Sequence, residues 1–328
     1  MRAPRRLRVR TLATLGLLLA AGCADRGPAR EVEVVVPPGA GAVEIGRRLE
    51  EAGLLRFPRL FALTARLKGW EGSLKAGRYR FRTDQGWAEI LTAMEKGEVV
   101  TFPLTIPEGF TVREVAPRLA ALSGVPDDSV RGLASDTAFA RELGVPGPTL
   151  EGYLFPETYR FAEGVEPALA LRTMVDRYRE FWTTARRARA DSLGLSEADV
   201  VTLASIVERE ARVAEERPVI AGVYLNRLRI GMLLQADPTV QYALGEPRER
   251  LMYSDIERVA DHPYNTYTHS GLPPGPIASP GRAALQAVLE PAEVPFLFFV
   301  ARPDGSHVFT RTEREHINAK NRIRREER

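Results

Sequence analysis

The sequence predicts an α+β protein, because short alternating strands are interspersed with longer segments of helical periodicity. Residues 31–37 are valine-rich, and residues 74–83 alternate aromatic side chains with arginines, as half-buried strands do. A β-hairpin is predicted around Asp304-Gly305, a dipeptide typical of tight turns. Residues 167–192 and 196–217 each repeat apolar side chains at the spacing of a helix. We therefore expect an α+β N-terminal region followed by a mainly helical domain with a small hairpin.

Length and composition indicate a globular chain of more than one domain. The 328 residues are enough for two or three domains. A content of 44% hydrophobic and 27% charged residues excludes a disordered chain and a multi-span membrane protein. The net charge of +3 is spread along the chain, so nucleic acid is not expected as a partner. The four histidines lack the spacing of a zinc site, and we expect neither a metal nor a cofactor.

Residues 1–23 are interpreted as an export signal of the lipoprotein type or a short membrane anchor. Five arginines precede an apolar run at residues 12–22, which ends at Cys23, the only cysteine. The run is about half the ~20 residues of a spanning helix. Small residues before Cys23 resemble a lipobox, although Ala20 stands where leucine is usual. Both interpretations tether the chain to the cell (inner) membrane, with everything after a linker at residues 24–30 on the extracytoplasmic side.

Residues 31–125 contain a strand–turn–helix unit twice. The segment at 36–49 recurs about seventy residues later at 106–119. Both copies have a proline and a glycine in the turn. Both then have a glutamate, an isoleucine or valine, an arginine and a leucine at the same helix positions. Such modules resemble LysM-like folds, which hold peptidoglycan, and a plain α+β spacer is the alternative. The mainly helical domain is then expected at residues 126–328.

One carboxylate falls on an apolar helix face. At 3.6 residues per turn, Glu210 lies within a stripe formed by Leu203, Ile206, Val207, Val213 and Ala214. Glu208 is expected on the polar side, with Arg212 and Glu215 in reach. Because desolvation disfavours a charged carboxylate, it raises the pKa toward the value that a general acid needs near neutral pH. Glu210 is therefore the candidate catalytic acid.

Other chemistries are not supported by the sequence. No serine lies in a Gly-x-Ser-x-Gly elbow, and no glycine-rich phosphate loop follows a strand. Asp237 precedes Pro238 and is interpreted as the N-cap of a helix that runs to residue 244. Glu210 then has no obvious second carboxylate, which suggests that the substrate supplies its own nucleophile.

Two further stretches have the composition of a binding surface. Residues 150–159 interleave aromatics and acids, which suits either the core or a sugar-binding cleft, because aromatic faces stack on pyranose rings. Residues 262–276 form a loop rich in Pro, Gly, Asn and Tyr, as expected of a binding rim.

An ordered set of motifs resembles the YceG-like family of endolytic murein transglycosylases. The motifs are Leu-Ala-Ser-Ile-Val-Glu-Arg-Glu at 203–210, Asn-Arg-Leu at 226–228, Leu-Gln-Ala-Asp-Pro-Thr-Val at 234–240, Tyr-Asn-Thr-Tyr at 264–267 and Gly-Leu-Pro-Pro-Gly-Pro-Ile at 271–277. The resemblance implies a LysM-like region ahead of a catalytic domain related to lysozyme and lytic transglycosylases. It also implies cleavage of nascent glycan strands to leave 1,6-anhydro-N-acetylmuramic acid ends, which terminates elongation, and a cell-wall polymerase as partner.

By this resemblance Glu210 is the catalytic acid that cuts peptidoglycan glycan strands. The candidates for holding the N-acetyl and hydroxyl groups of the sugars are Asn226, Gln235, Tyr264, Asn265 and Tyr267, and local hydrogen bonding is the alternative for each. Two other functions stay open: a muramidase that hydrolyses the same bond with Asp237 as second carboxylate, and a non-catalytic peptidoglycan-binding lipoprotein.

Overall fold

The computed structural model describes residues 28–326, apart from residues 68, 247 and 249–250. The chain divides into two compact units, of which the first ends at Phe102 and the second begins at Pro103. This division comes earlier in the chain than the expected boundary at residue 125. The predicted signal or anchor lies outside the described residues. Within those residues, no helix combines the length and the apolar character needed to cross a membrane.

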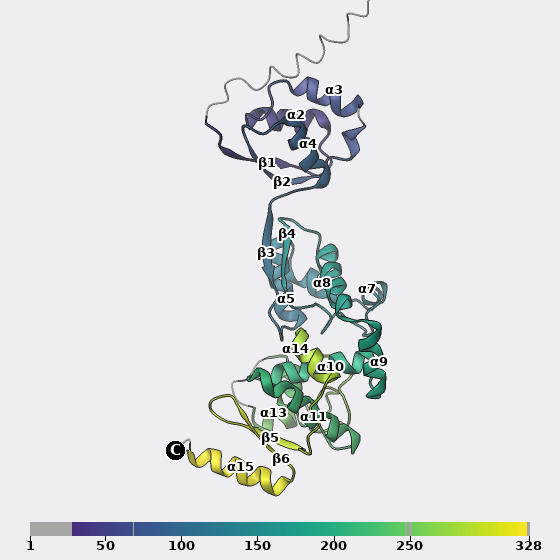
Figure 1. Cartoon of the computed structure of the whole chain (residues 1–328), viewed down its shortest axis with the longest axis vertical. Helices are drawn as coiled ribbons and strands as arrows, with labels where there is room; N and C mark the ends of the chain where they lie inside the picture. The colour runs from purple at the N-terminus through teal and green to yellow at the C-terminus, as the bar shows by residue number, and fades with distance from the viewer. Residues whose placement is uncertain (1–27, 68, 247, 249–250, 327–328) are drawn as a thin grey trace, which may run out of the picture. The chain divides into compact units, whose positions relative to one another are not determined.

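In the described residues of the N-terminal unit, a two-stranded sheet packs with three α-helices (Figure 1). Strands β1 and β2 are antiparallel, and their register pairs Glu31 with Arg82 at one end and Val36 with Gly77 at the other. The elements are β1 (Glu31–Val36), α2 (Ala42–Glu51), α3 (Pro58–Leu67), the 3-10 turn η2 (Trp70–Gly72), β2 (Gly77–Arg82) and α4 (Trp87–Lys96).

Alternation along the two strands builds the core of this unit. Val34 and Val36 of β1 and Tyr79 and Phe81 of β2 are buried, while Glu33 on the other face bonds Arg78 and Arg80 at 3.1 and 3.0 Å. The apolar side chains of α2 and α4 complete the core. The predicted alternation at residues 74–83 is therefore confirmed.

The second unit begins with a two-stranded sheet, β3–β4, and five helices. These elements are β3 (Thr101–Thr105), α5 (Val112–Ser123), α6 (Asp127–Ala134), α7 (Thr137–Glu142), β4 (Thr158–Ala162), α8 (Pro167–Phe181) and α9 (Thr184–Ser192). Both copies of the repeat form a strand, a turn and a helix, as predicted. The second copy, β3 and α5, belongs mostly to the second unit, because β3 pairs with β4 and not with β1 or β2.

Of the remaining elements, helices α11, α12 and α14 pack against helix α10, and the described residues end in a hairpin and a helix (Figure 1). The remaining elements are α10 (Glu197–Glu210), η3 (Ala214–Glu216), α11 (Arg217–Arg229), α12 (Asp237–Leu244), α13 (Tyr253–Arg258), α14 (Arg282–Leu289), β5 (Phe298–Ala301), β6 (His307–Thr310) and α15 (Glu313–Glu326). Strands β5 and β6 are antiparallel around Asp304-Gly305, so the predicted hairpin and the α+β class are confirmed.

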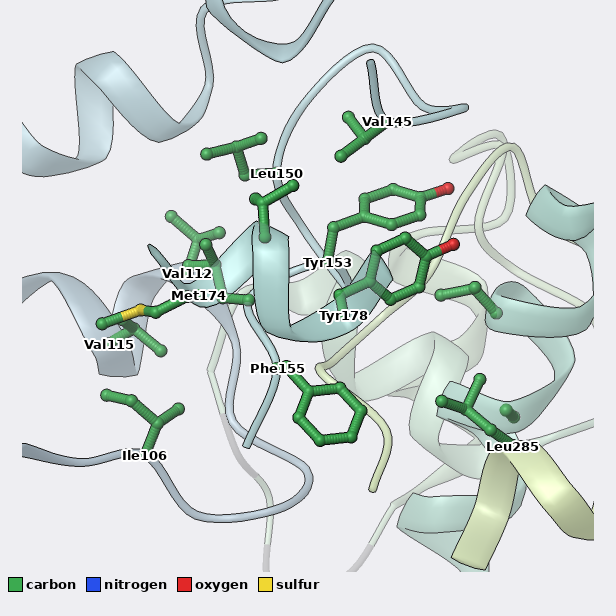
Figure 2. Close-up of a cluster of buried hydrophobic side chains, with 14 of the residues drawn as sticks. Ile106, Val112, Val115, Val145, Leu150, Tyr153, Phe155, Met174, Tyr178 and Leu285 are labelled. Carbon is green, nitrogen blue, oxygen red and sulfur yellow. The ribbon is translucent and has the colours of Figure 1, made fainter. Parts of the chain in front are cut away.

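A single hydrophobic core joins the two halves of the second unit. Figure 2 shows side chains from α5, α8 and the 150–155 segment gathered together, with Tyr153 beside Tyr178. Their rings meet edge to face, with centroids 5.2 Å apart, a favoured aromatic geometry. Leu285 of α14 belongs to the same cluster. The core thus fixes α10 and α14 against the earlier helices.

Two predicted helices end earlier than expected. The helix predicted at residues 167–192 is two helices, since Trp182 adopts an extended conformation and the Thr183 hydroxyl accepts a hydrogen bond from the Arg186 amide at the start of α9. The helix predicted to reach residue 217 ends at Glu210, because Ala211 is extended. Side-chain periodicity does not reveal such breaks, since apolar residues continue on both sides of each one.

Candidate active site

Glu210 is the last residue of α10, and the start of that helix is firmly fixed. The Ser196 hydroxyl accepts a hydrogen bond from the Asp199 amide, and the Asp199 carboxylate accepts one from the Ser196 amide, which forms the predicted capping box. The helix is buried from Val200 to Val207. Val213 and Ala214 were expected on its apolar stripe but lie beyond its end, so Glu210 occupies the final turn.

The carboxyl group of Glu210 has few hydrogen-bond donors to stabilise a negative charge. Its one described hydrogen bond comes from the Tyr224 hydroxyl on α11, 2.8 Å from Oε1. Burial raises the pKa of Glu210 to about 7; the nearby Asp237 also raises it, while Tyr224 and Arg227 oppose the shift. The last turn of a helix further disfavours an anion. Glu210 is therefore substantially protonated near neutral pH, as a general acid requires.

Glu208 has a different environment, and the expectation that it faces solvent beside Arg212 and Glu215 is wrong. Its side chain is only 6% exposed and pairs with Arg217 at 3.2 Å. Its other oxygen accepts the amide hydrogen of Gly281 at 3.0 Å, at the N-cap of α14. Because α14 and α11 cover α10 on this side, no polar face is left there. Glu208 therefore links three helices.

A cavity of about 820 Å³ lies beside Glu210, and we call it the catalytic cavity. Its volume is typical of sites that enclose a small-molecule ligand. Glu210, Gln235, Asp237 and Tyr267 line it together with Tyr224 and Arg227 of α11. Strand β5 and helix α15 contribute further lining residues: Phe298, Phe299, Val300, Ala301, Glu313, His316, Ile317, Lys320 and Arg324.

Gln235 reaches the catalytic cavity from a strained backbone. Its φ of 47° makes it the one non-glycine residue with positive φ in the described part of the chain. The Gln235 amide donates to the Thr266 carbonyl at 3.0 Å, and the next amide, of Ala236, donates to the Thr266 hydroxyl at 2.9 Å. Strained conformations that neighbours hold in place concentrate at functional sites. The Tyr-Asn-Thr-Tyr loop thus holds Gln235 beside Glu210.

Asp237 does not act as the predicted N-cap. Helix α12 has Ala236 at its N-cap, and no side chain caps it. The Asp237 carboxylate instead accepts a hydrogen bond from the Tyr267 hydroxyl, and both residues line the catalytic cavity. Asp237 is therefore a second carboxylate of the cavity, restrained by Tyr267.

Three of the predicted sugar ligands make other contacts and are not among the residues that line the catalytic cavity. The Asn226 amide donates to the carbonyls of Val294 and Phe296. Asn265 is fully buried and donates to the carbonyls of Ile256 and Val259. Tyr264 packs against Tyr242 with ring centroids 4.9 Å apart. For these three, the contacts match the alternative of local structural bonding.

Sequence reasoning did not identify the cationic part of the catalytic cavity. Arg227 is buried and donates to the carbonyls of Leu233, Leu234 and Leu297, and its guanidinium lies 5.3 Å from the Phe298 ring centroid. Lys320 and Arg324 come from α15. The sequence signal for Arg227 was its place in the Asn-Arg-Leu motif at residues 226–228. In the described residues, no group of His, Cys, Asp and Glu is placed to hold a metal ion.

The chain is similar to known proteins over most of its length. The chain is 31% identical to the endolytic murein transglycosylase of Bacillus subtilis (strain 168), over 88% of this chain and 84% of the relative. The endolytic murein transglycosylase of Streptococcus pneumoniae serotype 2 (strain D39 / NCTC 7466) is also 31% identical, over 90% of this chain but 60% of the longer relative.

The match extends to a solved structure and to a whole family. A putative YceG-like protein from Listeria monocytogenes has a TM-score of 0.61 and 31% identity to this chain, covering 89% of it and 100% of the Listeria chain. Residues 34–322 match the YceG-like family, which is most of the sequence. This chain is a member of the YceG-like family.

Proposed function

We propose that the protein is a peptidoglycan lyase, an endolytic transglycosylase that cuts glycan strands with Glu210 as its acid. The observation that carries the proposal is the Glu210 carboxyl, which burial keeps protonated near neutral pH at the edge of an 820 Å³ cavity. The names of the Bacillus and Streptococcus relatives supply the substrate class.

The reaction requires one group that first gives and then takes a proton. Protonated Glu210 donates its proton to the glycosidic oxygen as the bond from that oxygen to C1 of N-acetylmuramic acid breaks. The Glu210 carboxylate then accepts the proton of the muramyl O6 hydroxyl as O6 bonds to C1. The products are a 1,6-anhydro end and a free hydroxyl on the other fragment, and no water is consumed. A pKa of about 7 suits both transfers, because acid and conjugate base are then close in free energy.

Other residues of the catalytic cavity would position the sugar. Gln235 offers an amide for an N-acetyl or hydroxyl group, and the phenol of Tyr267 can hydrogen-bond or stack. Arg227 brings a fixed positive charge near Glu210, which stabilises the carboxylate formed after the first proton transfer. Asn226, Tyr264 and Asn265 are not included as sugar ligands in this proposal, because their contacts lie elsewhere.

A hydrolytic muramidase is the second candidate function, and Asp237 favours it. This carboxylate lines the same cavity and acts electrostatically on Glu210, so it could activate a water molecule as a general base. Mass spectrometry of fragments released from purified glycan strands separates the two reactions. Anhydro ends support the transglycosylase, and reducing ends support the muramidase. Wild-type protein that binds strands without cutting them would contradict both and indicate a binding protein.

We further propose that the N-terminal unit holds peptidoglycan as a LysM-like module and that the catalytic unit is related to lysozyme. The support for the LysM-like interpretation is that the N-terminal unit has a two-stranded sheet packed with short helices. The proposed role also includes attachment to the membrane, a cell-wall polymerase as partner and termination of nascent strands.

Glycan strand lengths in cells that lack the protein test the proposed termination of strands. The strands should become longer without the protein. Wild-type protein should restore their normal length, and Glu210→Gln should not.

A further inference from the structure

A second cavity of about 480 Å³ lies in the same unit, and the reaction described above does not use it. Its lining includes Arg113 and Glu114 of α5, Glu151, Arg209 of α10, the α12 residues Pro238, Gln241, Tyr242 and Ala243, and His262. Glu151 belongs to the stretch at 150–159 whose composition suits a sugar-binding cleft or the core. We call this space the second cavity.

The two cavities share a boundary made by α10 and α12. Of the last two residues of α10, Arg209 lines the second cavity and Glu210 lines the catalytic cavity. In the same way Asp237 lines the catalytic cavity and Pro238 the second. Gln241 lines both. The two cavities are therefore neighbours along α12 and share Gln241 in their linings, so a linear polymer bound at Glu210 would have to pass Gln241 to reach the second cavity.

The second cavity is lined by side-chain types that are suited to binding carbohydrate. Tyr242 and His262 offer rings, Gln241 offers an amide, and Arg113 and Arg209 offer guanidinium donors. Aromatic faces pack against pyranose rings, and polar side chains in a concave site fix the orientation of a ligand. Its volume is again that of a site for a small ligand.

Glu151 forms the buried floor of this site. It is 9% exposed, and its carboxyl oxygens accept the Val112 amide hydrogen at 3.1 and 3.2 Å at the start of α5. The Tyr242 hydroxyl lies 3.5 Å from Oε2. Glu151 therefore ties together α5 and α12, the two elements that carry Arg113 and Tyr242.

We propose that the second cavity binds sugar residues of the same glycan strand, beyond those held next to the cleaved bond. This inference rests on the proposed function, because it takes a glycan strand as the substrate. Binding in the second cavity would explain why cleavage falls within a glycan strand. Sugar residues on one side of the cleaved bond would occupy a site that α12 separates from Glu210. Strands long enough to reach the second cavity are then better substrates than short oligomers.

The test compares kcat/KM per bond for long strands and for the shortest oligomer that the wild-type protein cleaves. The substrates are glycan oligomers separated by length after partial digestion of purified peptidoglycan. We expect the long-to-short ratio to be about ten in wild type. It should fall toward one, mainly through a higher KM for long strands, when Arg113→Ala removes a charged hydrogen-bond donor. Ala243→Trp, which fills the cavity from α12, should reduce the ratio as well.

Arg118→Ala is the matched control. Arg118 is also exposed on α5, but its guanidinium lies over the Phe110 ring and it does not line either cavity. It should leave the ratio at the wild-type value. A wild-type ratio of one, or an unchanged ratio in both Arg113→Ala and Ala243→Trp, would overturn the inference. If wild type cleaves no oligomer of any length, the proposed function itself fails.

Discussion

At the end of α10, the surroundings of Glu208 and of Glu210 have opposite effects on a negative charge. Around Glu208, the Arg217 guanidinium and the Gly281 amide both favour a negative charge. Around Glu210, a single phenol donates a hydrogen bond, while burial and Asp237 disfavour the charge. Both side chains leave the same helix, so the difference comes entirely from what α11, α14 and the 235–237 segment bring to each.

This comparison separates stability from catalysis. A carboxylate that is paired and hydrogen-bonded, as Glu208 is, holds elements of the fold together. A carboxyl with few partners in a cavity keeps its proton and can exchange it with a ligand. Substitutions that alter one region at a time should therefore change different quantities.

The largest effect is expected from Glu210→Gln. The amide cannot donate an acidic proton, so cleavage of glycan strands should fall by roughly 10²–10⁴-fold, the usual contribution of a general acid. Folding should be preserved, because the amide oxygen can still accept the Tyr224 hydrogen bond. Turnover and thermal unfolding are measured together, with exposed Glu215→Gln of η3 as a control that retains activity. Near-wild-type turnover in the Glu210→Gln variant would exclude Glu210 as the catalytic acid.

Glu208→Gln should act on stability. It removes the charge that pairs with Arg217 but keeps an acceptor for the Gly281 amide, so we expect a loss of about 1–3 kcal/mol in the free energy of unfolding. Turnover of the folded protein should change by less than about tenfold, since Glu208 does not line the catalytic cavity. Denaturant unfolding and activity at low temperature check this. A folded but inactive Glu208→Gln would reverse the assignment of the two glutamates.

Tyr224→Phe sharpens the description of Glu210 through pH dependence. In wild type, kcat/KM should fall as the pH rises above about 7, because the acid loses its proton. The Tyr224 hydrogen bond favours the charged form and lowers the pKa of Glu210. Removing it should move the alkaline limb to higher pH and reduce the maximum rate by several-fold to tenfold. An alkaline limb that stays in place would show that another group controls it.

The smallest effect is expected in the cationic part of the catalytic cavity. Lys320 and Arg324 line the cavity from α15, whereas Arg322 on the same helix is exposed and does not. The muramyl side chain of peptidoglycan carries carboxylates, so Lys320→Ala with Arg324→Ala should raise KM a few-fold at low salt and less at high salt. Arg322→Ala should leave KM unchanged. Equal effects of the two changes would mean that only the net charge of α15 matters.

Much of the fold could be predicted because it depends on local pattern. Alternation located β1, β2 and the hairpin, and the turn residues located the repeat. Helix ends at Trp182 and Ala211 were missed, since they depend on burial and on capping by neighbouring residues and not on periodicity. The pairing of β3 with β4, rather than with an N-terminal strand, is a contact between distant segments that local pattern does not reveal.

For the candidate site, the sequence pointed to Glu210 but not to its surroundings. Glu210 lies in an apolar segment as expected, although the helix ends there instead of continuing. Gln235 and Tyr267 came from motifs and do line the catalytic cavity. The Gly281 partner of Glu208 and the carbonyl contacts of Asn226 lie about seventy positions away in the chain. Nothing local in the sequence marks such contacts, so neither could be predicted.

Carboxyl-carbon NMR of glutamate-labelled protein tests most directly whether Glu210 is a protonated acid near neutral pH. The structure predicts two glutamates that titrate near pH 7, Glu210 and Glu151. One of the two signals should disappear in Glu210→Gln, and the other in Glu151→Gln. If the signal lost in Glu210→Gln instead titrates near the ordinary value of about 4.3, Glu210 is already a carboxylate at neutral pH and the account of this site is wrong.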